Sequence, residues 1–289
     1  MTRKTWLFIG ASGRIGRMLM AHWRQEPPKG MRIVAQSRHS QETDVLVWSP
    51  LGGANALLAW IDHHGPVDGM FVFSGVTPAP LAKLSDNATL AEACLSAAHV
   101  ANIPTVLLAT SSAVYGAGNG TAMRETAPLQ PANDYGRAKV AAEAVCAGWR
   151  ANGTDVTCLR IGNVIGADAL LLNAENASVA SPLRLDVFAD GHGPRRSYIG
   201  PATLARVLAK LASSEQLPES LNIAAPMPVT MQSLISEVKV PWVGTAAPAT
   251  AHQNITLDCS LLANFFSFVP SASDPKTMIA EWQGLKDQE

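Results

Sequence analysis

The strongest constraint on the fold is an alternation of short apolar segments with segments of helical character. The apolar segments lie at 6–9, 31–38, 44–48, 67–76, 104–112, 155–166 and 220–225. Helical segments are expected at 15–23, 57–64, 89–103 and 134–153. Strands that are apolar on both faces and alternate with helices indicate a parallel sheet covered on both sides. We therefore predict a doubly wound α/β fold of the Rossmann type, with its ligand crevice at the carboxyl ends of the strands.

A glycine turn joins the first apolar segment to the first helical one. Gly10, Gly13 and Gly16 are spaced three apart, and apolar residues then recur at helical spacing. Such glycines permit a tight bend, a close approach of backbone to a pyrophosphate, and close packing of helix on strand, while the helix N–H groups attract phosphates. A secretory peptide is excluded, because Gly10 interrupts the apolar run and such peptides need about 7–15 apolar residues. The turn predicts dinucleotide binding.

Composition excludes several classes of protein. The 289 residues carry a formal net charge of -1, without the excess of Lys and Arg that nucleic-acid binding needs. The uncharged stretch 93–123 is cut by polar residues, proline and glycines, so we expect no membrane span. The four cysteines lack zinc or disulfide spacing, which favours reduced thiols in a cytoplasmic protein. His63, His64 and His192 have no third ligand at a fitting spacing, so we predict no metal site.

The pattern predicts two parts of unequal regularity. We assign 1–166 to a dinucleotide-binding Rossmann domain, which a strand near 220–225 rejoins, and 167–289 mostly to a small C-terminal substrate-binding lobe. The alternation weakens after 166, since 167–194 is polar and loop-like and 226–289 mixes short helices with Pro-rich and Ala-rich connections. Substrate specificity is therefore expected to lie in the lobe.

A tyrosine and a lysine lie four residues apart in the segment 134–153. Tyr135 and Lys139 therefore project from one face of the expected helix. A neighbouring ammonium favours the phenolate, so we expect it to lower the pKa of Tyr135 and make the phenol a usable acid or base. Ser111 and Ser112 stand at the carboxyl end of the fifth apolar segment, where substrate meets cofactor in this fold. The competing interpretation is an exposed Tyr and Lys on an amphipathic helix.

Seven short motifs together carry a resemblance to a known family. They are GASGRIG (10–16), FVFSGV (71–76), NATLAEAC (87–94), ATSSAVYG (109–116), ETAPLQPANDYGRAK (125–139), LRIGNVIG (159–166) and RSYI (196–199). In this order the sequence resembles an extended short-chain dehydrogenase/reductase, the NAD(P)-dependent epimerase/dehydratase family. The resemblance implies the Rossmann fold, a nicotinamide dinucleotide and a small-molecule substrate, and it is compatible with a homodimer.

The resemblance also implies roles for individual residues. It makes Tyr135 the general acid–base, Lys139 its electrostatic partner and ribose anchor, and Ser111 the catalytic hydroxyl, with Ser112 as the alternative. Asn163 and Arg196 match positions that touch substrate phosphates in sugar-nucleotide members, a surface salt bridge being the alternative for the arginine. The expected cofactor contacts are Gly10, Ser12, Gly13, Arg14, Ile15, Gly16, Ser37, Arg38, Ser74, Gly75, Val76, Tyr135 and Lys139.

Departures from the family pattern modify these expectations. The ribose-binding carboxylate is missing after the second strand, which ends in Gln36, Ser37 and Arg38, so we prefer NADP and keep NAD as the alternative. Ser112 and Ala113 replace the acidic pair typical of dehydratases, which disfavours elimination. The segment 167–190 is short for a lobe gripping a nucleotide sugar, and the family's aspartate after RSYI is replaced by a threonine at 203.

The resulting expectation is an NADP-preferring oxidoreductase or epimerase. It transfers a hydride to or from a carbonyl or hydroxyl carbon of a sugar-like or small carbonyl substrate, while Tyr135 moves the proton. Two alternatives remain open. One is a sugar-nucleotide epimerase that retains its cofactor. The short lobe favours net reduction or oxidation over this alternative. The other is a dinucleotide-binding redox sensor without catalysis, although such relatives usually lack the Tyr and Lys pair.

Overall fold

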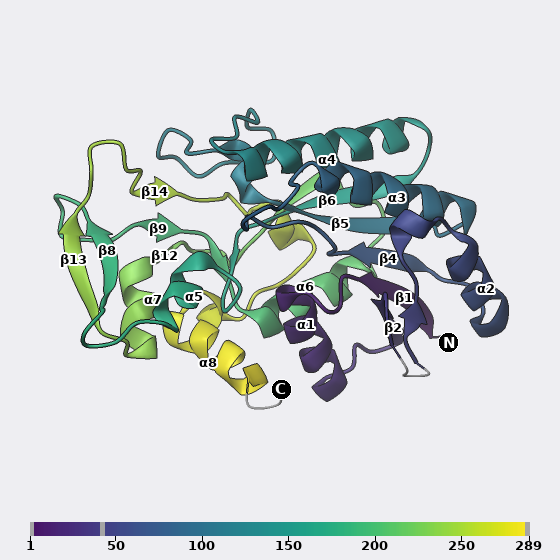
Figure 1. Cartoon of the computed structure of the whole chain (residues 1–289), viewed down its shortest axis with the longest axis horizontal. Coiled ribbons are helices and arrows are strands. Elements are labelled where there is room, and N and C mark those ends of the chain that lie inside the picture. The colour runs from purple at the N-terminus through teal and green to yellow at the C-terminus, as the bar shows by residue number, and fades with distance from the viewer. Residues whose placement is uncertain (1–2, 41–43, 287–289) are drawn as a thin grey trace.

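In a computed structural model, which describes residues 3–40 and 44–286, a seven-stranded sheet forms the centre of the molecule (Figure 1). Its order is β11-β6-β5-β4-β1-β2-β3, and every neighbouring pair is parallel. The strands are β1 (Lys4–Ile9), β2 (Met31–Ser37), β3 (Leu46–Val47), β4 (Gly69–Val72), β5 (Thr105–Ser111), β6 (Asp155–Ile161) and β11 (Ser220–Ile223). All seven lie within the apolar segments named above except for short extensions at their ends, so the doubly wound prediction is confirmed.

Helices cover both faces of this sheet. The helices α3 (Asp86–Val100) and α4 (Asp134–Ala151) lie against one face, and α1 (Arg14–Gln25) and α6 (Pro201–Leu211) against the other (Figure 1). The remaining helix of this part, α2 (Asn55–His64), contacts β3 near the sheet edge. The helix α6 was not anticipated, although it starts with Pro201 at a position that suits proline and buries most of its length.

The core consists of two layers, one on each face of the sheet. Successive residues of β1 alternate between them: Trp6 and Phe8 join one layer, and Leu7 and Ile9 join the other. All four side chains are at most 2% exposed. Burial of each contributes roughly 1.5–3 kcal/mol, which explains why residues 6–9 form a continuously apolar run. The ring of Trp23, on α1, packs 5.5 Å from that of Phe8 and fixes the helix on the sheet.

The lobe is built from three small sheets around two helices. Their strands are β7 (Asn163–Val164) with β10 (Tyr198–Ile199), β8 (Leu183–Val187) with β13 (Trp242–Ala246), and β9 (Arg195–Arg196) between β12 (Val229–Thr230) and β14 (Asn254–Ile255). The helices are α5 (Ala169–Ala174) and α7 (Met231–Val238). The expectation that 167–194 is loop-like was therefore wrong. The physical reason is that β8 is stabilised by β13, a partner more than fifty residues away.

The C-terminal helix α8 (Pro275–Lys286) packs against α1, α6 and α7. Its Glu281 carboxylate accepts hydrogen bonds from the backbone N–H of Thr203 at 2.8 Å and from the Thr203 hydroxyl at 2.5 Å, and pairs with Arg206 at 3.1 Å. A carboxylate at the start of α6 is favoured by the helix dipole. The acid that the sequence lacks at position 203 is thus supplied from α8.

Short 3-10 turns complete the chain: η1 (Pro50–Gly52), η2 (Ser112–Tyr115), η3 (Leu262–Asn264) and η4 (Pro270–Ser273). Across the described residues, no helix has both the length and the apolar character that crossing a membrane requires.

Candidate functional site

The glycine turn between β1 and α1 is required by close backbone contacts. Gly10 has φ +95°, and a Cβ there would lie 2.5 Å from the backbone nitrogen of Ser74. A Cβ on Gly16 would lie 2.2 Å from the carbonyl oxygen of Gly10. The helix begins after Gly13, with no side chain capping it and no acid in its first turn. Its N–H groups are therefore suited to a phosphate.

A cavity of about 430 Å³, here the glycine-turn cavity, opens beside this bend. It is lined by the predicted cofactor residues Gly10, Ser12, Gly13, Arg38, Ser74, Gly75 and Val76. Arg14 and Ile15 line the next cavity, whereas Gly16 and Ser37 line neither. Gly16 acts through packing, and the Ser37 hydroxyl donates to the carbonyl of His39 and accepts from its N–H.

Gln36, at the end of β2, where the sequence lacks the expected carboxylate, forms hydrogen bonds to the glycine turn and to Trp48. Its Oε1 accepts a hydrogen bond from the N–H of Gly10 at 3.2 Å, and its Nε2 donates to the carbonyl of Trp48. The side chain is 6% exposed, so it braces the turn from inside. Arg38 is exposed, and among the described residues it is the one lysine or arginine on the wall of this cavity. The end of β2 therefore places a positive charge on the wall where an NAD-specific site places a negative one, and Asp86, at the start of α3, is a carboxyl on the same wall.

Asn87 is a positioning residue that motif reasoning did not assign. Its Oδ1 accepts from the N–H of Val76 at 3.2 Å, and its Nδ2 donates to the carbonyls of Val76 and Leu84, both at 2.9 Å. A Cβ on Gly75 would lie 2.8 Å from this Oδ1 and 3.2 Å from Lys139 Nζ. The loop after β4 is thus fixed at the point where the glycine-turn cavity meets the cavity that contains Tyr135.

The second cavity, about 520 Å³ and here the Tyr135 cavity, lies at the carboxyl ends of β4, β5 and β6. It shares Gly75 and Val76 with the glycine-turn cavity. Of the predicted site residues it is lined by Arg14, Ile15, Gly75, Val76, Ser111, Tyr135, Lys139 and Asn163. Tyr135 and Lys139 therefore point into a cleft rather than into solvent, which argues against the exposed-pair interpretation.

Tyr135 is brought to Ser111 by a tight contact between α4 and η2. Asn133 caps α4 by accepting from the N–H of Gly136 at 2.8 Å. A Cβ on Gly136 would lie 2.5 Å from the carbonyl oxygen of Ala113, so only glycine permits this approach. Ser111 ends β5, and its hydroxyl accepts from the N–H of Ala113 at 3.2 Å.

Electrostatics in this cavity differ from the sequence expectation. Burial raises the pKa of Tyr135, and the hydrogen bond with Ser111 opposes that rise. Burial lowers the pKa of Lys139 to about 8, and the charge of Glu143 opposes the fall. The expectation that Lys139 lowers the pKa of Tyr135 was therefore wrong for the protein alone, because desolvation dominates. The Lys139 ammonium lies 5.7 Å from the Tyr135 ring centre and donates to the carbonyl of Ala109 at 3.3 Å.

The third cavity, about 570 Å³ and here the Arg196 cavity, extends from Tyr135 into the lobe. It is lined by Ser111, Ser112, Tyr135, Asn163 and Arg196 of the predicted residues. The guanidinium of Arg196 donates to the carbonyls of Arg195, Gln253 and His252 at 2.7, 2.8 and 3.1 Å. No acid within the described part of the chain forms an ion pair with it, which removes the salt-bridge alternative there.

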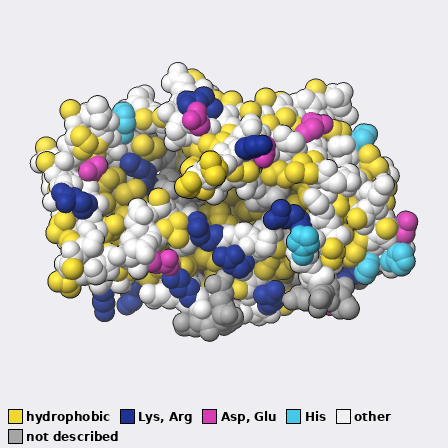
Figure 2. Space-filling view, viewed as in Figure 1, with side chains coloured by type: hydrophobic (Ala, Val, Ile, Leu, Met, Phe, Trp, Pro, Cys, Tyr) yellow, Lys and Arg dark blue, Asp and Glu magenta, His cyan; other side chains and the backbone are white. Residues whose placement is uncertain are grey.

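Burial disfavours the charged form of Arg196 and so lowers its pKa; an anion bound in this cavity would stabilise that charge. On the face shown in Figure 2, lysine and arginine side chains lie around a hollow whose floor is hydrophobic. His252 is a further basic side chain on the wall of the Arg196 cavity.

Asp168 is a carboxyl in the Tyr135 cavity that the sequence analysis did not assign. Its Oδ1 caps α5 by accepting from the N–H groups of Leu170 and Leu171 at 3.0 and 3.2 Å. Burial raises its pKa to about 6. Spacing alone gave no signal for it, because the residue reaches the cavity from a helix that was not expected.

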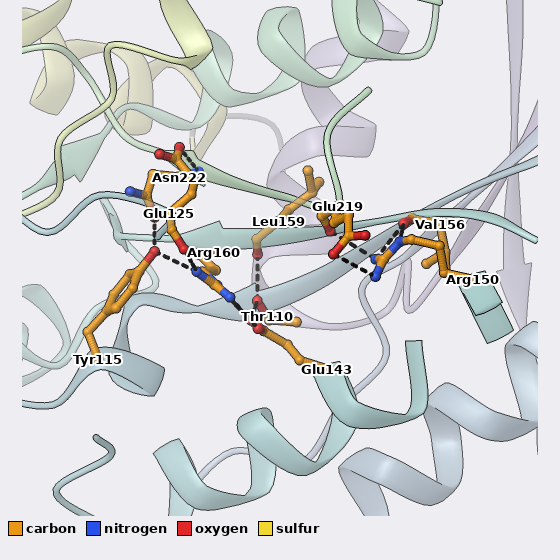
Figure 3. A network of polar contacts seen from close by, with 10 residues as sticks. All are labelled: Thr110, Tyr115, Glu125, Glu143, Arg150, Val156, Leu159, Arg160, Glu219 and Asn222. Atoms are coloured by element: carbon orange, nitrogen blue, oxygen red, sulfur yellow. Dashed lines mark hydrogen bonds and ion pairs between the residues drawn. The ribbon is translucent and has the colours of Figure 1, made fainter. Parts of the chain in front are cut away.

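A buried polar network lies beneath the site (Figure 3). Arg160 pairs with Glu143 at 2.8 Å and donates to the Tyr115 hydroxyl at 2.9 Å. Thr110 donates to Glu143 at 2.8 Å, and Tyr115 donates to Asn222 at 2.8 Å. The network joins α4, β5, β6 and β11, so it fixes the elements that carry Lys139 and Ser111.

A family model and two curated relatives all point to the epimerases. The model of the NAD dependent epimerase/dehydratase family matches residues 6–223. A UDP-glucose 4-epimerase of Azospirillum brasilense is 34% identical over 149 residues, which are 48% of this chain and 41% of that protein. One of Lactobacillus helveticus is 35% identical over 92 residues, 31% of this chain and 28% of that protein. The matches thus span less than half the length of these curated relatives.

Solved structures of similar fold cover the chain almost completely. The UDP-Glc/GlcNAc 4-epimerase of Campylobacter jejuni superposes with a TM-score of 0.78 and 17% identity, covering 99% of this chain and 100% of that one. A UDP-glucose-4-epimerase of Stenotrophomonas maltophila, with bound NAD and formylated UDP-arabinopyranose, gives 0.78 and 18%, covering 99% of each chain. The lobe therefore has a counterpart of the same fold in these enzymes.

Proposed function

Because the chain belongs to the NAD-dependent epimerase/dehydratase family, as its motifs predicted, we propose that it is a nicotinamide-dependent oxidoreductase acting on a phosphate-bearing sugar substrate. The short lobe favoured net reduction or oxidation, but epimerisation with retained cofactor is now the preferred form, because 4-epimerases are among the relatives and their fold covers the lobe as well. The observation that carries the proposal is the convergence of Tyr135, Lys139 and Ser111 on one cavity between the glycine turn and Arg196. A non-catalytic redox sensor would have no use for that convergence.

The residues along the two inner cavities fit a dinucleotide. Gly10, Gly13 and the uncapped start of α1 would hold the diphosphate, and Lys139 would anchor a ribose. Arg38, on the cavity wall in place of a carboxylate, supports a preference for NADP over NAD, since it would attract a 2′-phosphate. When bound, the cofactor accepts or donates a hydride at the nicotinamide ring.

The protein's part in the reaction is proton transfer and alignment. Tyr135, a phenol whose pKa is raised by burial, would donate a proton to the substrate oxygen in the reductive direction, and its phenolate would take the proton back in the oxidative one. Ser111 would hold that oxygen against the phenol, and Arg196 would bind the substrate phosphate. Dehydration is disfavoured, because Ser112 and Ala113 line the cavity where an acidic pair would be needed.

The test compares Tyr135→Phe with the wild type. Turnover of UDP-glucose and related sugar nucleotides should fall by about 10²–10⁴-fold, the usual contribution of general acid–base catalysis, while dinucleotide affinity stays within about twofold. A reductase releases oxidised cofactor stoichiometrically, whereas an epimerase shows no net change in reduced-nicotinamide absorbance. Thermal shifts with NAD and NADP decide the cofactor preference. Full turnover by the phenylalanine variant would refute the assignment of Tyr135.

A further inference from the structure

Asn222, in β11, sits at the junction of the buried network with the lobe. It is 0% exposed. Its Oδ1 accepts from the Tyr115 hydroxyl at 2.8 Å, and its Nδ2 donates to the carbonyls of Met123 and Asp258 at 2.9 and 3.0 Å. Figure 3 shows the Tyr115 hydroxyl directed at this amide. One acceptor and two donors are used at once, which no other side chain of this size provides.

The two carbonyls belong to segments that form one wall of the Arg196 cavity. Met123 lines the cavity itself, and so do Ile255, Thr256 and Leu257, just before Asp258. The segments also pair directly, since Met123 N–H donates to the Thr256 carbonyl and Asp258 N–H to the Met123 carbonyl, both at 2.9 Å. Asn222 therefore clamps the wall from the sheet side.

The same wall segment fixes the orientation of Arg196. The guanidinium donates to the carbonyls of His252 and Gln253, at the start of the segment. Further along, Leu257 N–H donates to the Ser197 hydroxyl at 2.8 Å. A displacement of 252–258 would move the acceptors that hold the arginine, whereas the residues of the glycine-turn cavity lie outside this set of contacts.

We propose that Asn222 is a positioning residue for the substrate, which sets the wall of the Arg196 cavity without touching the ligand. The inference rests on the proposed function for the identity of the ligand. An aspartate at this position has nearly the same shape but cannot donate, so its oxygen would face two carbonyl oxygens. The wall would then shift away from the sheet, and substrate binding would weaken while cofactor binding would not.

The experiment compares Asn222→Asp with Thr157→Val. Thr157, in β6, is 1% exposed and donates to the carbonyl of Pro218 at 2.8 Å. The valine variant therefore loses one hydrogen bond in the same region of the sheet, but at a residue that lines none of the three cavities. Each variant is measured for KM and kcat with UDP-glucose, for affinity to UDP and to the dinucleotide, and for hydrogen exchange of 252–258. Unfolding in urea reports the loss of stability in both.

In Asn222→Asp, KM and the Kd of UDP should rise by about tenfold, equivalent to about 1.4 kcal/mol, with kcat within about threefold and dinucleotide affinity unchanged. The amides of 252–258 should exchange faster. Thr157→Val should change neither the KM and the Kd of UDP nor the exchange of 252–258. Unchanged KM, or an equal rise in the control, overturns the inference. If the wild type neither turns over UDP-glucose nor binds UDP, the proposed function fails. The positioning role of Asn222 is then decided by amide exchange, and an unchanged exchange rate of 252–258 in Asn222→Asp overturns it.

Discussion

Asp168 gives the sharpest quantitative prediction. Burial raises the pKa of this carboxyl from its ordinary value of 3.8 to about 6 in the folded protein, and the side chain is 7% exposed. Each tenfold change in proton affinity is worth about 1.36 kcal/mol, so the full difference corresponds to about 3 kcal/mol. Because the folded pKa is the higher one, this stability is fully present below pH 3.8 and is lost as the pH rises through about 6.

The variant Asp168→Asn keeps an oxygen to cap α5 but has no proton to lose. Its free energy of unfolding, relative to wild type, should therefore rise by roughly 1.4 kcal/mol between pH 5 and pH 8, about half of the full effect. Any constant cost of the amide cancels in this comparison. Urea unfolding at both pH values measures it.

A matched control is Asp190→Asn. Its carboxyl accepts hydrogen bonds from Gln253, which hold the pKa of Asp190 below its ordinary value, so this substitution should not gain stability as the pH rises. A pH-independent difference between Asp168→Asn and wild type would refute the reasoning, and so would a difference that falls toward pH 8.

Two further substitutions, each with a matched control, test contacts that hold the elements around the site together. Gly16→Ala should lower dinucleotide affinity at least tenfold by fluorescence titration, because its Cβ would lie 2.2 Å from the Gly10 carbonyl oxygen. Gly148→Ala, on α4 with open space around it, should keep that affinity and gain up to about 1 kcal/mol; equal losses in both would contradict the argument. Glu281→Gln should lose about 1–3 kcal/mol in urea unfolding, since a charge-assisted contact at the start of α6 is removed from a carboxylate that is only 12% exposed. Glu175→Gln, which breaks an exposed pair, should lose less than about 1 kcal/mol, and a larger loss there would refute the burial argument.

The central sheet was predictable because its signal is local. A strand segment buried on both faces is favoured to be continuously apolar, as 6–9 is, and this holds whatever its partners are. The lobe lacked such a signal. The strand 183–187 pairs with 242–246, and 195–196 lies between 229–230 and 254–255, so these short strands are defined by remote partners rather than by their own composition.

The candidate site divides in the same way. Tyr135, Lys139 and Ser111 were predictable from spacing and from the position of a strand end, and the structure brings them to one cavity. Asn87 and Asn222 were not, because their roles lie in hydrogen bonds to loops and segments that the folded chain brings to them. Asparagine is common in both loops and caps, so its residue type alone distinguishes neither role.

In the proposed acid–base pair, the charge of Lys139 depends on a buried acid that lies outside the cavities. Burial alone would favour a neutral Lys139, and a neutral amine does not stabilise a phenolate on Tyr135. Glu143, one helical turn beyond the lysine, opposes that effect, and its own charge is held in place by Arg160. The charge of Lys139 therefore depends on an ion pair whose residues line none of the three cavities. Sequence spacing identifies Tyr135 and Lys139 as candidate residues, whereas the buried network beneath them, through Glu143, supports the charge of the lysine.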